Sequence, residues 1–151
     1  MSIPQSLPSR IETAVAPIIG SRIVRFLGLL GLCAAYLQGG LNKLFDYPAA
    51  IGEMQHFGLE PAHLFAPLVI ALELGASVMI LTGIGRWLGA LALAAFTLAA
   101  TFIALAFWQL PPGHERFMAA NSFFEHLGLS GGFLLVAWMD VKRRPRSATA
   151  A

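Results

Sequence analysis

The chain has 151 residues, of which 57% are hydrophobic and 12% charged, and its mean hydropathy is +0.70. A soluble domain carries about 25% charged residues, and a chain this short cannot bury so much apolar surface away from water. These values exclude an ordinary water-soluble domain and predict a single-domain integral membrane protein. The isoelectric point near 9.1 does not indicate nucleic-acid binding, because the basic residues lie beside apolar runs and not in a patch of their own.

The first half of the chain predicts two membrane spans joined by a surface segment. Residues 1–20 contain three prolines and little periodicity, so we expect a mobile tail or a short surface segment there. Ser21 can cap a first helix over about residues 22–44 that reaches Phe45. The short amphipathic stretch from Ile51 to Phe57 is expected to lie along the membrane surface. Pro61 then suits the first turn of a second helix, predicted over residues 62–83.

The second half predicts two further spans. Residues 87–110 form a run of 24 residues without a charge that ends before Pro111. Trp87 and Trp108 in this run are about 31 Å apart along a helix, which matches the hydrocarbon thickness of a bilayer. The fourth span, residues 122–139, is expected to open with a capping box of Ser122 and Glu125, so we interpret Glu125 as a cap and not as a catalyst.

Together these elements predict an all-α integral membrane four-helix bundle over residues 21–140, followed by a basic tail at 141–151. The basic residues set its orientation. An N-terminus inside the cell places eight of the ten basic residues on the cytoplasmic side and leaves only Lys43 and Arg116 outside. This asymmetry predicts that both termini are cytoplasmic.

The residues that usually hold metals or redox groups are scarce. Cys33, the only cysteine, lies in an apolar run, so we expect a small core residue and exclude iron–sulfur clusters. The four histidines fall on the outer side with no spacing typical of metal ligands, and only His126 approaches the depth that a haem ligand needs. We therefore expect no metal site and no intrinsic cofactor.

Glu73 is the most informative polar residue, because it lies near the centre of the second span. A carboxylate at this depth costs several kcal/mol unless it is paired or protonated. It is either a functional contact for a proton, a quinone or another ligand, or a neutral brace that bonds neighbouring helices. We expect it to be protonated near neutral pH unless a cation reaches it. Lys43 is predicted to lie too far away, about 15 Å in depth along the helices, so the expected partners are Gln38, Thr97, Thr101 or a bound ligand.

Other polar side chains on the outer halves of the spans form a funnel toward Glu73. Lys43 lies at the outer mouth, where the alternative to a ligand contact is snorkelling to the interface. His126 lies one turn inside the membrane and is a candidate proton or ligand contact. The candidate ligand or proton site consists of Glu73, Gln38, Asn42, Lys43, Thr101 and His126.

Short motifs follow one another at specific spacing between about Arg25 and Trp138. They are Gly39-Gly40-Leu41-Asn42-Lys43-Leu44-Phe45-Asp46, His56-Phe57-Gly58-Leu59, Glu73-Leu74-Gly75, Thr82-Gly83-Ile84-Gly85-Arg86, Phe123-Phe124-Glu125-His126-Leu127 and Gly131-Gly132-Phe133-Leu134-Leu135. With these motifs the chain resembles the DoxX family of four-helix inner-membrane proteins. The resemblance marks Lys43, Glu73 and Arg86 as the polar signature of the family. Family members often carry Asn-Phe-x-Lys-Asn at the last helix, and this chain lacks that lysine, which puts an anion-binding role there in doubt.

The resemblance implies a location in the bacterial inner membrane and a likeness to members attached to quinone-linked oxidoreductases, such as thiosulfate:quinone oxidoreductase, and to oxidative-stress complexes. Two hypotheses follow. The chain is a membrane subunit of such a redox system, which binds a quinone or small hydrophobic ligand, anchors a redox partner, or does both. Alternatively, it is a non-enzymatic membrane anchor or assembly factor whose polar residues brace the bundle. A solute carrier is a weaker third hypothesis, because no pair of broken-helix repeats is present. The expected partners are the lipid bilayer and either a partner protein or further copies of the chain, without nucleic acid.

Overall fold

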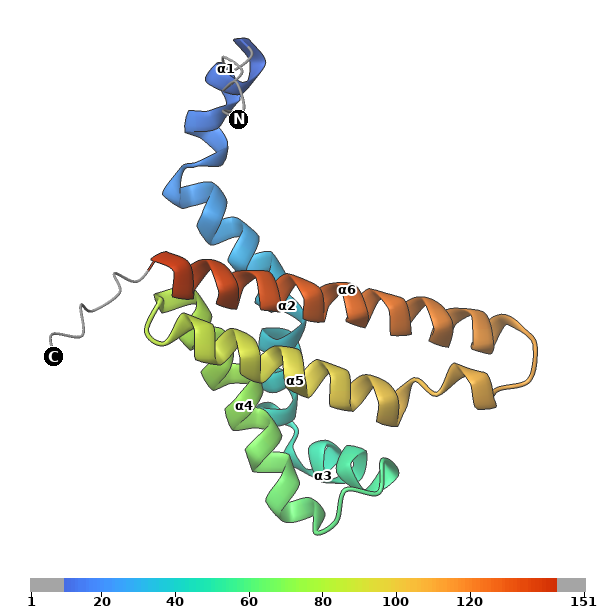
Figure 1. Cartoon of the computed structure of the whole chain (residues 1–151). Helices are drawn as coiled ribbons and strands as arrows, with labels where there is room; N and C mark the ends of the chain where they lie inside the picture. The colour runs from blue at the N-terminus through green and yellow to red at the C-terminus, as the bar shows by residue number, and fades with distance from the viewer. Residues whose placement is uncertain (1–9, 144–151) are drawn as a thin grey trace, which may run out of the picture.

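The computed structural model describes residues 10–143, and this part of the chain is helical apart from short connections (Figure 1). In chain order the elements are α1 (Arg10–Ile19), α2 (Arg22–Phe45), α3 (Tyr47–His56), α4 (Ala62–Thr82), α5 (Arg86–Ala104), the 3-10 turn η1 (Phe107–Gln109) and α6 (His114–Arg143). No strand occurs within residues 10–143, so the predicted all-α class is confirmed.

Local chemistry sets the limits of the first two predicted spans. The Ser21 side chain accepts a hydrogen bond from the Val24 amide at 3.2 Å and starts α2. α4 begins directly after Pro61 and ends at Gly83, whose φ of 88° is the left-handed conformation that closes many helices. Because these signals are local, α2 and α4 begin and end within one residue of the helix limits that the sequence predicts.

The third predicted helix is shorter than expected. α5 leaves helical geometry at Leu105, and η1 follows, so the predicted span over residues 87–110 agrees with the candidate span 86–109 but is not one continuous α-helix. Ring packing explains the break, because Phe107 and Trp108 both lie edge-on against Phe123 of α6, with ring centroids 5.4 and 5.8 Å apart. Trp108 therefore does not share a helix with Trp87.

The helices at and near the ends of the chain also differ from expectation. α6 starts eight residues before Ser122, so Ser122 and Glu125 lie inside a helix and the predicted capping box is wrong. The extension follows from the strong helix formers in residues 114–120. α1 is helical in the region where we expected a mobile tail or a surface segment, and α3 is longer than the predicted stretch because the Asp46 side chain caps it by accepting from the Ala49 amide at 3.1 Å.

Three helical segments are long and apolar enough to cross a membrane. They are Arg22–Phe45, Ala62–Thr82 and Arg86–Gln109, with mean hydropathies of 1.4, 2.2 and 2.3. α6, which contains the expected fourth span, is not among them, and its apolar stretch is interrupted by polar residues that include Glu125 and His126.

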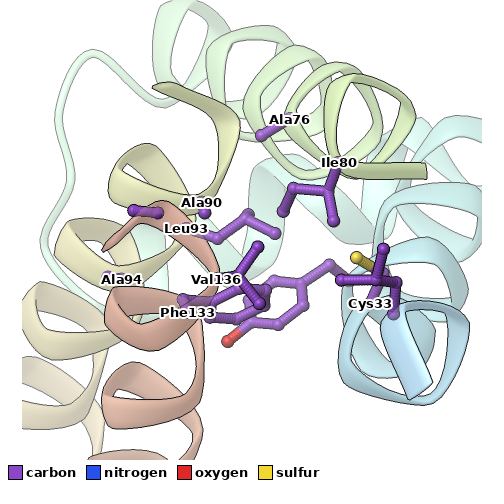
Figure 2. Close-up of a cluster of buried hydrophobic side chains, with 11 residues drawn as sticks. Cys33, Ala76, Ile80, Ala90, Leu93, Ala94, Phe133 and Val136 are labelled. Atoms are coloured by element: carbon purple, nitrogen blue, oxygen red, sulfur yellow. The ribbon is translucent and has the colours of Figure 1, made fainter. Parts of the chain in front are cut away.

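Side chains from α2, α4, α5 and α6 meet in one apolar core (Figure 2). Cys33, Ile80, Leu93 and Phe133 are fully buried there, which confirms that Cys33 is a core residue. α5 and α6 lie side by side as an antiparallel pair (Figure 1).

The placement of α3 decides what α2 meets. A second apolar cluster joins α3 to the first turns of α4 through Ala50, Met54, Ala62 and Ala66. α2 therefore ends beside the middle of α4 and not beside its start. At Gly40, a Cβ atom would lie only 2.8 Å from the Leu74 side chain and 3.3 Å from the Cβ of Glu73. This close approach of the two backbones brings the end of α2 next to Glu73.

Candidate functional site

Lys43 lies between two carboxylates. Its Nζ atom is 3.5 Å from Oε2 of Glu73 on α4 and 3.5 Å from Oε2 of Glu53 on α3. The prediction that Lys43 is too far from Glu73 is wrong. The prediction estimated the membrane depth of each residue from its position along its own helix. In the structure, α2 ends beside the middle of α4, so the two residues lie at the same level. The exposed fractions of the three side chains are 13% for Lys43, 8% for Glu73 and 42% for Glu53, so the group runs from a buried to a half-exposed carboxylate.

The Glu73 carboxylate is paired with a charge but incompletely hydrogen-bonded. Its Oε2 atom is buried and has no hydrogen-bond partner among the described residues. Gly39 keeps the space around this atom open, because a Cβ at that position would lie 3.6 Å from Lys43 Nζ and 3.7 Å from Glu73 Oε2. The Lys43 ammonium, 3.5 Å away, faces this oxygen as an ionic partner, so Oε2 has charge compensation but accepts no hydrogen bond from the described residues.

A cavity of about 500 Å³ opens beside Glu73 between α2, α3, α4, α5 and α6. Most of its lining is apolar and includes Met54, Phe57, Phe65, Val69, Phe96 and Ile103. Within residues 10–143, its polar lining consists of Tyr36, Lys43, Glu53, Glu73, Thr97 and His126. An apolar cavity of this size with a few polar groups has the usual form of a small-molecule site.

Threonines orient the polar groups of the wall formed by α5. The Thr97 hydroxyl donates to the Leu93 carbonyl at 2.6 Å, so the Tyr36 hydroxyl donates to Thr97. The Thr101 hydroxyl donates to the Thr97 carbonyl at 2.6 Å, so His126 donates from Nδ1 to Thr101 at 2.9 Å. With each threonine proton already used, the Tyr36 oxygen and His126 Nε2 remain as acceptors.

The structure brings some of the predicted site residues together and separates others. Glu73, Lys43 and His126 line the cavity, and Thr101 lies behind His126. Gln38 and Asn42 are exposed on α2 and do not line the cavity, so neither satisfies Glu73.

Sequence reasoning missed Tyr36 and Glu53 as site residues. Tyr36 lies seven residues before Lys43, which is two helical turns and therefore the same helix face. Glu53 lies on the predicted amphipathic segment. Either signal could have found these residues once Lys43 was chosen as a candidate.

Arg86 lies at the other end of the bundle. Its Nε donates to the Ile80 carbonyl at 2.8 Å, and its Nη1 lies 3.7 Å from Oδ1 of Asp140. These contacts close the turn between α4 and α5 and connect α5 to the end of α6. The three signature residues therefore form one ion pair at the cavity, between Lys43 and Glu73, and one brace at the opposite end.

Comparison with known proteins identifies the family of the chain. No curated protein and no solved structure matches the chain with significance. The model of the DoxX family matches residues 25–106, which is more than half of the chain. This region covers the second candidate membrane span and all but three residues of each of the other two, contains Lys43, Glu73 and Arg86, and ends before α6. The chain therefore belongs to the DoxX family of membrane proteins.

Proposed function

We propose that this protein is a membrane subunit of a quinone-linked or oxidative-stress redox system in the bacterial inner membrane, and that its cavity binds a quinol, the reduced form of a quinone. The observation that carries the proposal is the apolar cavity of about 500 Å³ with the buried Oε2 atom of Glu73 in its wall, an atom that faces Lys43 but accepts no hydrogen bond from the described residues. The apolar tail and ring faces of a quinol suit the apolar lining, and its two hydroxyl groups contact the polar residues.

The hydrogen-bond inventory of the cavity favours the reduced form. Glu73 Oε2, the Tyr36 oxygen and His126 Nε2 are acceptors, and the Lys43 ammonium is the one clear donor among the polar lining residues. A quinol carries two hydroxyl donors, whereas a quinone offers only carbonyl acceptors. Sites that leave buried polar groups unpaired discriminate strongly against the wrong ligand, so we expect the quinol to bind more tightly.

The charge of the site points the same way. Lys43 carries one positive charge and lies between two carboxylates, so the ionised group has a formal charge of −1. This charge repels anionic ligands and attracts groups that donate protons or hydrogen bonds. Electron transfer requires a redox group, and a chain with one buried cysteine provides no iron–sulfur ligands, so we assign that group to a partner protein.

We also propose four spans with both termini in the cytoplasm. α6 has 30 residues, or about 45 Å of helix, and packs along α5, which is a candidate span. The basic residues at the start of α2, the start of α5 and the end of α6 support a cytoplasmic location for that end of the bundle.

A binding measurement tests the ligand. The protein is purified in mild detergent, and its affinity for a short-chain quinone and for the matching quinol, kept reduced without oxygen, is measured by quenching of tryptophan fluorescence. We expect quinol binding to exceed quinone binding. We expect Glu73→Gln to weaken quinol binding by about tenfold, the loss of one hydrogen bond to a charged group. Gln38→Ala is the matched control, because Gln38 is exposed on α2 and does not line the cavity.

Mass spectrometry of the purified protein identifies co-purifying small molecules in the same preparation. Equal affinity for both redox forms, or unchanged quinol binding by Glu73→Gln, contradicts the proposal. Absence of any binding favours the second hypothesis, in which the protein is an anchor or assembly factor and Glu73 is a brace.

A further inference from the structure

Two adjoining hollows lie at the end of the bundle opposite the ligand cavity. One has a volume of about 570 Å³ and lies where α1, the start of α2 and the end of α6 meet. The other, of about 110 Å³, lies between α2, α5 and α6. Arg25 and Arg143 line both hollows, so the two form one continuous surface, which we call the arginine hollow.

The arginine hollow is strongly positive. Among the described residues, Arg22, Arg25, Arg86 and Arg143 line it, and Asp140 is the one acidic residue in this lining. Asp140 lies 3.7 Å from Arg86, which leaves a formal charge of +3 in the hollow. Guanidinium groups present several donors in a planar fork that matches phosphate oxygens. The first turn of α2 borders the hollow and adds the positive end of a helix dipole. This chemistry favours a phosphate group.

Apolar side chains surround the same arginines. Ile19 and Val24 line the larger hollow, and Leu29, Val136 and Met139 line the smaller one. α1 adds an apolar stripe, because its exposed residues Ile11, Val15 and Ile18 recur at helical spacing. Such a helix lies in the interface between head groups and acyl chains. A free phosphate ion makes no contact with apolar surfaces, whereas a phospholipid contacts the arginines with its phosphate and the apolar side chains with its acyl chains.

We propose that the arginine hollow binds one anionic phospholipid, with its phosphate among Arg22, Arg25 and Arg143 and its acyl chains along Leu29, Val136 and the adjoining apolar face. Basic pockets between membrane helices on the cytoplasmic side suit anionic head groups. The site is independent of the quinol cavity, because the two have no lining residue in common. The bound lipid fixes the angle between α1 and α2 and joins α6 to both.

Native mass spectrometry of the full chain in mild detergent tests this site. The delipidated protein is titrated separately with phosphatidylglycerol, with phosphatidylcholine of the same acyl chains, and with inorganic phosphate. We expect one tightly bound phosphatidylglycerol and at least about tenfold weaker binding of phosphatidylcholine. Each basic residue near an anionic lipid raises the affinity by about fivefold, and several arginines line the hollow. Equal binding of the two lipids overturns the proposal. The proposal is also overturned if inorganic phosphate alone binds as tightly as phosphatidylglycerol, because the hollow would then be a site for free anions.

Matched variants locate the lipid. Arg25→Gln/Arg143→Gln removes two charges from the hollow, and Arg116→Gln/Lys142→Gln removes the same charge from residues that do not line it. We expect the first pair to weaken phosphatidylglycerol binding by about tenfold or more and the second pair to leave it within about twofold of the original. An equal loss in both pairs shows that only net charge matters and refutes a defined site. Arg22→Gln serves as the test if the first pair does not fold.

Discussion

Replacing Lys43 with methionine should destabilise the protein more than any other single change in its ionic group. The Lys43 ammonium lies 3.5 Å from both Glu73 and Glu53, and methionine retains most of the side-chain length while it removes the charge. The Glu73 side chain is only 8% exposed, so Lys43→Met leaves a buried carboxylate without a cation. Removal of one partner from a buried ion pair costs about 3–5 kcal/mol. We expect about 3 kcal/mol here, the lower end of this range, since the Lys43 side chain is 13% exposed.

Two further variants show how exposure sets the size of the effect. Glu53 is 42% exposed, and exposed ion pairs contribute about 1 kcal/mol or less, so Glu53→Gln should have little effect. Glu73→Gln removes the buried charge and leaves Lys43 paired with Glu53, with an expected cost of about 1 kcal/mol. The double variant Lys43→Met/Glu73→Gln should be more stable than Lys43→Met alone, because it no longer buries an unpaired charge.

The measurement is the free energy of unfolding in mixed detergent micelles, followed by circular dichroism while the fraction of sodium dodecyl sulfate is raised. The expected order of destabilisation is Lys43→Met first, Glu73→Gln second and Glu53→Gln last. If Lys43→Met costs no more than Glu53→Gln, or if the effects in the double variant simply add, the Lys43–Glu73 contact is not an energetic pair and this reasoning is wrong.

Two further predictions concern topology and packing. Single cysteines at Gly113 and at Ala148, which lies outside the described residues, should react oppositely with an impermeant maleimide in intact cells when the native cysteine is replaced by alanine; labelling of the tail position contradicts cytoplasmic termini. Gly89→Ala should destabilise the protein by about 1–3 kcal/mol, because its Cβ would lie 2.8 Å from the Ala76 carbonyl oxygen. Gly128→Ala, where nothing lies within 4 Å of the new Cβ, should be neutral or stabilising in the same detergent titration.

The class of protein and the limits of two helices follow from the sequence alone, because both depend on short stretches of chain. Composition excludes a soluble domain, and Ser21 and Gly83 act on backbone groups within four residues of themselves. The motifs around Lys43, Glu73 and Arg86 also sufficed to indicate the DoxX family, which the family match confirms. The sequence likewise placed Cys33 in the core, since an isolated cysteine in an apolar run is usually buried.

Only the tertiary structure decided which polar residues meet. The position of α3 against the first turns of α4 makes α2 end beside Glu73, and the depth of a residue along its own helix cannot reveal this offset. Gln38 and Lys43 are near neighbours on α2, yet one is exposed and the other pairs with Glu73, because a helix presents different faces to its neighbours. The break in α5 depends on ring contacts with Phe123, a residue nearly twenty positions later in the chain. The sequence therefore predicts the individual helices, whereas contacts between segments far apart in the chain form the cavity.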